Sequence, residues 1–173
     1  LSEKLYDLKL PMGRLKTGTP ARIKLSSINL SLMEEQPGDT NPPPMSVLQP
    51  PQAMLPQISC YITRTNKKTH KIISDNIHLS AMYSGKISGI GPRYCPSIED
   101  KINKFGEKDS HQIFIEPEGL DKDLVYPNGI STSLPTSAQK EFVESIQGME
   151  NCIIEEFGYA VEYDFIDPRS LKP

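Results

Sequence analysis

The sequence predicts a mixed α/β domain with an irregular, proline-rich amino-terminal third, and three observations predict it. Several short segments alternate apolar and polar residues, which is typical of half-buried strands. Between them lie segments whose apolar residues recur every three or four positions behind a capping residue, as in amphipathic helices. The 173 residues also include 16 prolines and 11 glycines, with a triple proline in the first third. Much of that third should therefore lie outside regular elements.

The amino-terminal third is expected to begin with a short helix and continue as loop and arm. Residues 2–10 place leucines at helical spacing, and a proline then ends the pattern. Residues 11–23, PMGRLKTGTPARI, are rich in Gly, Thr and Pro and predict a loop or a short strand. Residues 26–56 predict an extended arm or connector, because prolines of this density forbid pairing in a sheet. A flexible linker is the alternative for this segment.

A strand followed by a helix is the next expected unit. Residues 57–65, QISCYITRT, alternate apolar residues on one face and predict the strand. Thr65 or Asn66 then caps a helix in which Ile73 and Ile77 share a face. The segment therefore predicts a strand followed by a helix.

A further helix is expected to open at Ser97. Asp100 stands three residues on, which is the spacing of a capping box. Ile98, Ile102 and Phe105 lie at helical intervals, and we expect them to form the buried stripe of this helix.

The carboxy-terminal third predicts strand, turn, helix and strand. HQIFIEPEG, from His111, predicts the strand, and the Pro-Asn-Gly of VYPNG is a turn signal. Ser137 is expected to cap the helix and Gly148 to close it. GYAVEYDFIDP predicts a half-buried last strand, because four apolar residues alternate along it: Tyr159, Val161, Tyr163 and Phe165.

The charge distribution bears on partners. A net charge of −3 argues against a chain that holds nucleic acid by bulk phosphate neutralisation alone. Local basic faces remain open, because cations cluster in two places. These are Lys9, Arg14, Lys16, Arg22 and Lys24, and then Arg64, Lys67, Lys68 and Lys71. Each cluster offers a weakly basic face for a polyanion.

The cysteine pattern and the hydropathy indicate a compartment. Cys60, Cys95 and Cys152 are far apart and form no C-x-x-C pair, which fits a reducing compartment. No apolar run approaches the roughly 18 residues of a membrane span, so we expect a soluble, cytoplasmic protein without a membrane partner. The first and last residues fall inside or just after an element, and we expect a piece of something longer.

Cys95 is the candidate nucleophile, within GIGPRYCPSIEDK. Its position before a helix start and two residues after Arg93 favours the thiolate, whereas Glu99 and Asp100 oppose it. A buried, inert cysteine is the alternative. The glycines before the helix would suit contact with a ligand's phosphates. The two acids are either first-turn helix charges or a general acid and base.

A second candidate site is the loop GRLKTGTP. Its glycines are five apart, as in a P-loop, but Thr-Pro stands where that motif needs Lys followed by Ser or Thr. Its backbone amides, Thr17, Thr19 and the cations Arg14 and Lys16 could still cradle an anion, and a plain tight turn is the alternative.

The histidines carry a weaker signal. His70, His78 and His111 have no metal-ligand spacing with any cysteine, so no metal site is expected. A Cys–His nucleophile pair stays open, because its partners would meet in space rather than in sequence.

Taken together, several long segments resemble the MnmG (GidA) family of tRNA uridine 5-carboxymethylaminomethyl modification enzymes. They are GRLKTGTPARI, CYITRTNKKTHKIISDNIHLSAMYSGKISGIGPRYCPSIEDK, HQIFIEPEG with VYPNGISTSLP, and GYAVEYDFIDPRSLKP. The resemblance spans essentially the whole chain. It implies a Rossmann-type FAD-binding flavoprotein that takes hydride from NADH. With the GTPase MnmE, it adds an aminomethyl or carboxymethylaminomethyl group at C5 of the wobble uridine of certain tRNAs, using methylenetetrahydrofolate as the one-carbon donor.

The resemblance also implies roles for residues. Cys95 would be the catalytic thiol that adds to C6 of uracil, which makes C5 nucleophilic. Arg14, Lys16 and Thr17 would contact an anion or tRNA near the active centre. The segment that resembles the nicotinamide dinucleotide site comprises Gly91, Pro92, Arg93, Tyr94, Cys95, Pro96, Ser97, Ile98, Glu99, Asp100, Lys101, Ile102, Asn103, Lys104 and Phe105.

The organisation that the resemblance implies is that of a central fragment. Residues 1–25 would end a flavin-domain segment, 26–56 form the arm, 57–166 the mixed α/β inserted domain, and 167–173 the return towards the flavin domain. The main FAD site would lie outside this chain, which alone is expected to be inactive, and the full-length enzyme would be a homodimer.

Three functional hypotheses follow. The chain contributes residues to catalysis in the flavin enzyme, or it is a non-catalytic NADH- and tRNA-binding module whose chemistry resides wholly on the flavin domain. An independent cysteine hydrolase is the third.

Overall fold

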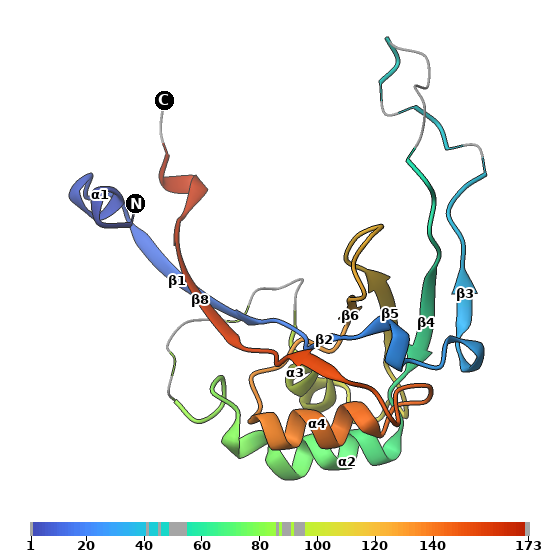
Figure 1. Ribbon diagram of the computed structural model, residues 1–173. Helices are drawn as coiled ribbons and strands as arrows, with labels where there is room; N and C mark the ends of the chain where they lie inside the picture. Colours follow the sequence, from blue (N-terminus) through green and yellow to red (C-terminus); the bar gives the residue numbers. More distant parts are fainter. Residues whose placement is uncertain are drawn as a thin grey trace.

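The computed structural model describes residues 2–40, 42–44, 46–48, 55–85, 87, 91 and 96–171. Its fold is mixed α/β, as predicted, with two sheets in which every described strand pairing is antiparallel. The larger sheet has the order β3-β4-β5-β6-β2-β7, and β1 pairs with β8 in a separate two-stranded ribbon (Figure 1). The strands are β1 Met12–Gly18, β2 Arg22–Ile23, β3 Glu34–Gln36, β4 Cys60–Arg64, β5 Gln112–Pro117, β6 Val125–Asn128, β7 Ile154–Glu156 and β8 Ala160–Ile166.

The larger sheet and three helices enclose the core, and we call this unit the body. The α-helices of the chain are α1 Ser2–Asp7, α2 Lys67–Asn76, α3 Ile98–Lys104 and α4 Thr136–Glu144, and short 3₁₀ turns are η1 Leu25–Ser27, η2 Leu30–Leu32, η3 Ile77–Leu79 and η4 Pro168–Ser170. Helices α2 and α4 lie side by side beneath the sheet (Figure 1). Ile113 and Ile115, two apart on β5, join Ile73, Ile98 and Phe142 from the three helices in one buried cluster. Burial of this apolar surface is the main stabilising term of the body.

Capping residues fix where two of the helices begin. The Asn66 side chain accepts a hydrogen bond from the Thr69 backbone N–H at 3.0 Å, and the Thr69 hydroxyl accepts one from the Asn66 N–H at 3.4 Å. Asn66 Nδ2 also donates to the Ser145 carbonyl at 2.7 Å, which ties the start of α2 to the end of α4. The Ser97 hydroxyl accepts from the Asp100 N–H at 3.1 Å at the start of α3. The predicted caps Asn66 and Ser97 are therefore confirmed.

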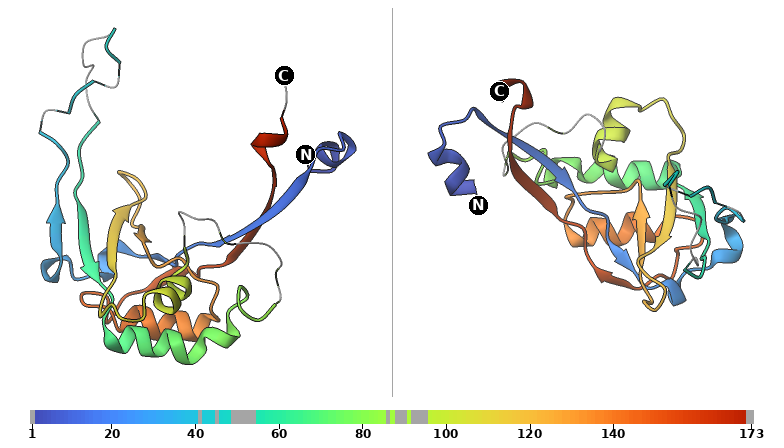
Figure 2. Two further views of the ribbon diagram at one scale, coloured as in Figure 1. Left: turned by 180° about the vertical axis from the view of Figure 1, so that it is seen from behind. Right: turned by 90° about the horizontal axis from the view of Figure 1, so that it is seen from above.

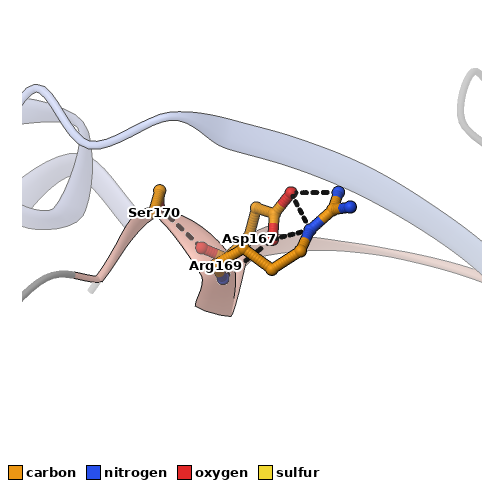
Figure 3. Close-up of polar contacts among 3 residues, drawn as sticks. All are labelled: Asp167, Arg169 and Ser170. Carbon is orange, nitrogen blue, oxygen red and sulfur yellow. Dashed lines mark hydrogen bonds and ion pairs between the residues drawn. The ribbon is translucent and has the colours of Figure 1, made fainter.

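The ribbon projects from the body and carries both ends of the described chain (Figures 1 and 2). Its register runs from Met12 opposite Ile166 to Gly18 opposite Ala160. Beyond β8, Asp167 caps η4 by accepting from the Arg169 N–H, and the Arg169 guanidinium folds back onto the same carboxylate at 2.6 Å (Figure 3).

A second projection contains residues 37–40 and 55–59, which adjoin β3 and β4 (Figures 1 and 2). The first residues of the proline-rich run pair with the sheet, since Glu35 lies opposite Tyr61. The expectation that this run forbids pairing is thus wrong at its start, where Glu34–Gln36 precede the prolines. Strands β2 and β3 precede residue 57 in the chain but belong to the same sheet as the strands that follow it. The predicted domain boundaries remain a prediction.

Several local expectations need correction. The loop or short strand expected at residues 11–23 contains a seven-residue strand, β1, because β8 supplies a pairing partner. Ser137 lies inside α4 instead of capping it: the Gln139 N–H bonds to the Pro135 carbonyl, so the helix begins earlier. Gly148 does not close α4, which ends at Glu144 with Ser145 as its C-cap; its φ of 84° belongs to the following turn.

Two expected buried faces are exposed. Phe105 is 43% exposed, because α3 ends at Lys104 and the extended φ of Phe105 turns its side chain off the helical face. Tyr159, Tyr163 and Phe165 are at least one-third exposed, because the ribbon has no further layer among the described residues. In the described part of the chain, no helix has the length and apolar character needed to cross a membrane.

Candidate functional site

A pocket of about 240 Å³ brings together two segments that the sequence singled out separately. It is lined by Lys16, Met82, Tyr83, Gly91, Asp100 and Lys104. Lys16 comes from the GRLKTGTP segment on β1, whereas Gly91, Asp100 and Lys104 belong to the segment expected to bind a nicotinamide dinucleotide. One residue of the first predicted site and three of the second therefore line the same pocket.

Lys16 reaches this pocket from the ribbon. Its ammonium group donates a hydrogen bond to the Met82 carbonyl oxygen at 2.9 Å. That contact links β1 to the turn that follows η3, across 66 residues of sequence. Because a lysine ammonium has three donors, the contact leaves further N–H groups available for a ligand.

Tyr83 and Asp100 also line the pocket and contact each other. The Tyr83 hydroxyl donates to Asp100 Oδ1 at 2.8 Å. Partial burial and then this hydrogen bond raise the pKa of Tyr83 above its usual value, so the phenol stays protonated and remains a donor. The side chain of Lys104, exposed on the last turn of α3, makes no hydrogen bond or ion pair with the described residues.

Glu99, next to Asp100 on α3, does not line the pocket and is fully buried. Its position in the first turn of α3 agrees with one of the two roles expected for it, but its side chain is 0% exposed, which the sequence did not indicate. One carboxyl oxygen, Oε1, accepts hydrogen bonds from Ser80, Thr132 and Ser133, each at 3.0 Å. No sequence signal near Glu99 predicts this burial, since its partners lie 19 to 34 residues away.

The rest of the dinucleotide segment divides into buried and exposed residues. Ser97, Ile98 and Ile102 are buried, whereas Asn103 and Phe105 are exposed and Pro96 is half-buried. Lys101 donates to the Gly129 carbonyl at 2.8 Å. Pro92, Arg93, Tyr94 and Cys95 lie outside the described residues, so the roles predicted for them remain predictions.

The other predicted anion contacts do not line the pocket. Arg14 donates to Asp164 at 2.8 Å and to Glu162 at 3.2 Å, which compensates its charge within the ribbon. These bonds, with Glu162 first, raise the pKa of Arg14. Thr17 lies opposite Val161 on the same strand.

The two cysteines that the structure describes are poor nucleophiles. Burial raises the pKa of the Cys60 thiol, and it raises the pKa of Cys152 to about 11. Both thiols are therefore protonated near neutral pH and neither lines this pocket.

Two of the histidines meet in space. The rings of His70 and His111 are 5.2 Å apart, and the Thr65 hydroxyl lies 2.7 Å from His70 Nε2. Burial is the main cause that lowers the pKa of both. Across the described ranges, no group of three or more His, Cys, Asp or Glu side chains could hold a metal ion.

Comparisons with known proteins agree on one relationship. The sequence profile of the family described as "Glucose inhibited division protein A" matches residues 1–173. Two solved structures of GidA from Aquifex aeolicus, in crystal forms I and II, are 49% and 45% identical to this chain, each with a TM-score of 0.81. The matches cover 96% and 99% of this chain but 29% and 27% of those chains. The chain thus spans less than a third of either.

Proposed function

The chain belongs to the GidA family, and from that premise we propose that it is the NADH- and tRNA-serving part of an FAD-dependent enzyme that modifies tRNA. The full enzyme would act with the GTPase MnmE as a homodimer. It would add an aminomethyl or carboxymethylaminomethyl group at C5 of the wobble uridine, with methylenetetrahydrofolate as one-carbon donor. The observation that supports this chain's share is the polar pocket between β1 and α3.

The side chains of the pocket suit part of a dinucleotide. The ammonium groups of Lys16 and Lys104 match phosphate oxygens, and a carboxylate such as Asp100 can accept hydrogen bonds from ribose hydroxyls. At about 240 Å³ the pocket is smaller than the roughly 300–1,000 Å³ of sites that enclose drug-sized ligands. It would therefore hold one portion of NADH, with the remainder elsewhere in the full enzyme.

The residues of this chain would bind and orient NADH, which supplies the hydride that reduces the flavin. Lys16 and Lys104 would neutralise phosphate charge, and Tyr83 would hold the Asp100 carboxylate in one orientation through the 2.8 Å hydrogen bond. The principal FAD site is assigned to the part of the enzyme outside this chain. No Gly-rich strand-turn-helix that would cradle its pyrophosphate occurs among the described elements.

Cys95 is proposed as the thiol that adds to C6 of uracil. The new S–C6 bond makes C5 nucleophilic, and after C5 is alkylated, loss of its proton and elimination of the thiolate restore the ring. The assignment draws on the family resemblance. In the alternative, the chain is a binding module and all chemistry resides on the flavin domain. The described lining of the pocket consists of binding groups, which both readings accommodate.

The NADH assignment is tested by reduction kinetics of the full-length, flavin-loaded enzyme. Asp100→Asn and Lys16→Gln should each raise the NADH concentration for half-maximal flavin reduction by about tenfold, since each removes one polar contact to the ligand. Lys68→Gln, on the exposed surface of α2, is the matched control and should leave it unchanged. Unaltered kinetics in both pocket variants would refute the assignment.

The role of Cys95 is tested in cells whose only full-length copy carries Cys95→Ser. Mass spectrometry of tRNA nucleosides should find the wobble modification lost while soluble enzyme retains its flavin, since serine is a far weaker nucleophile at neutral pH. Modification at its normal level would instead favour the binding-module alternative.

A further inference from the structure

One buried side chain connects the walls of the pocket without lining it. Glu99 is 0% exposed, and its Oε1 accepts from the Ser80 hydroxyl, the Thr132 hydroxyl and the Ser133 N–H, all at 3.0 Å. The donors come from two segments, the turn after η3 and the stretch between β6 and α4. Glu99 itself is on α3, next to Asp100, so three segments meet at one oxygen atom.

The hydrogen bond from Ser80 to Glu99 controls the position of the pocket wall that carries Met82 and Tyr83. The Ser80 and Ser133 hydroxyls are 2.6 Å apart, and the Met82 N–H donates to the Ser133 hydroxyl at 3.2 Å. The position of the Met82 carbonyl, which accepts from Lys16, therefore depends on groups that Glu99 holds.

The second link reaches the strand that carries Lys16. Thr132 donates its hydroxyl to Glu99 and its backbone N–H to the Thr19 carbonyl at 3.1 Å. A Cβ added at Gly18 would lie only 3.0 Å from the Thr132 carbonyl oxygen, so strand and segment are in close backbone contact. The end of β1 is thus set by the same residue that bonds to Glu99.

All three hydrogen bonds to the Glu99 carboxyl group are accepted by its Oε1 atom. Among the described residues, Oε2 is buried and has no hydrogen-bond partner. Deleting the side chain would leave two buried donors and one half-buried donor without this acceptor, which is more damaging than losing the bonds alone. A glutamine at this position would keep the Oε1 acceptor in place.

We propose that Glu99 is a positioning residue for nucleotide binding, which holds Lys16, Tyr83 and Asp100 in their binding geometry without touching the ligand. The inference rests on the proposed function of the pocket. It predicts that the consequence of losing Glu99 is specific to NADH, beyond any loss of stability.

A matched pair of variants in the full-length, flavin-loaded enzyme separates positioning from stability. Gln139 is also buried, 1% exposed, and makes three hydrogen bonds at 2.8 Å, to Leu134 and Gly158, away from the pocket lining. Glu99→Ala and Gln139→Ala should both lower the melting temperature. Only Glu99→Ala should raise the KM for NADH in flavin reduction, by about tenfold, with the rate at saturating NADH nearly unchanged.

Two milder variants keep the test decisive if Glu99→Ala does not fold. Glu99→Gln retains the acceptor and should bring KM to within about threefold of the unmodified enzyme. Thr132→Val removes the donor to Glu99 and the acceptor of the Leu134 N–H at nearly constant shape, and should raise KM less than Glu99→Ala.

The outcomes separate the inference from its premise. Equal KM changes in Glu99→Ala and Gln139→Ala, or no change in Thr132→Val with Glu99→Ala unfolded, would overturn the positioning role. Should Asp100→Asn leave KM unaltered as well, the pocket is not an NADH site and the proposed function fails first. A KM increase in Asp100→Asn together with unchanged KM in folded Glu99→Ala would overturn the inference alone.

Discussion

The body and the ribbon show similar sequence patterns but very different burial. Strand β5 of the body places Ile113 and Ile115 at 0% exposure, whereas on β8 of the ribbon the alternating Tyr163 and Phe165 remain 39% and 36% exposed. The body supplies both the sheet and the helices that cover it. The ribbon has two strands and ion pairs along one face, with no layer on its aromatic side among the described elements. Alternation therefore indicates a strand, but burial depends on which other elements the chain contributes.

The largest expected difference is in the cost of removing an aromatic side chain. Phe142→Ala should lower the free energy of unfolding by about 3–5 kcal/mol, because the side chain is 1% exposed and the deletion leaves a cavity. Tyr163→Ala, in the same 173-residue chain, should cost less than about 0.5 kcal/mol. Urea titration of both variants measures the contrast. Equal costs would mean that the ribbon face is packed in solution.

A smaller difference is expected for added methyl groups. A Cβ at Gly158 would collide with the Thr19 backbone oxygen and lie 3.2 Å from the Gln139 amide oxygen, so Gly158→Ala should cost about 1–3 kcal/mol. At Gly13 the Cβ would lie 2.5 Å from the Phe165 ring, which is exposed enough to rotate away. Gly13→Ala should therefore cost clearly less in the same titration, and the reverse order would contradict this reading of the two sites.

The two regions should also respond to acid at different pH. In the body, burial lowers the pKa of His70 and His111, so the unfolded chain binds protons more readily and stability falls as pH drops below about 6.5. In the ribbon, hydrogen bonds from Ser2 and then Arg14 lower the pKa of Asp164, and Arg169 lowers that of Asp167 to about 2. Their stabilisation is present above the usual aspartate range and is lost only as pH falls below about 4.

Melting temperature against pH checks this separation. His111→Gln should flatten the decline between about pH 6.5 and 5, and His78→Gln, on the exposed turn η3, is the matched control that should retain it. An unchanged decline in His111→Gln would exclude the histidine pair as its source.

The smallest effect is expected at the ribbon ion pairs. Arg14 is 43% exposed and its bonds to Asp164 and Glu162 are at the surface, where solvent screens them. Arg14→Gln should leave the unfolding midpoint of the body unchanged, and any small shift should disappear at high salt. A large, salt-independent loss would instead show that the ribbon and the body unfold as one unit.

Local signals made much of the fold predictable. Asn66 and Ser97 cap helices because their side chains bond to backbone groups only three residues away, a spacing visible in the sequence. The strands at β4 and β5 were likewise predictable from alternation. The prediction that Ser137 caps α4 was wrong because the Pro135 carbonyl serves as the first acceptor of the helix without any side-chain cap.

The candidate site was predictable only in pieces. Lys16 and Asp100 were each singled out by local composition, yet their meeting depends on β1 reaching the turn at Met82. The buried state of Glu99 depends on donors from Ser80 and Thr132, which no local pattern relates to it. Contacts between residues so far apart in the sequence follow from the packing of whole elements, and no short segment of the sequence predicts them.

The register of the ribbon has a mechanical consequence. Because Met12 lies opposite Ile166 and Gly18 opposite Ala160, a force that pulls residues 2 and 171 apart acts across the strand pairs one at a time. The strand pairs of the ribbon would separate one after another from the outer end, at low force, before any load reached the six-stranded sheet. Tension between the two chain ends would thus be absorbed by hydrogen bonds of β1 and β8, and Lys16, two pairs before the inner end, would be drawn out of the pocket before the body yields.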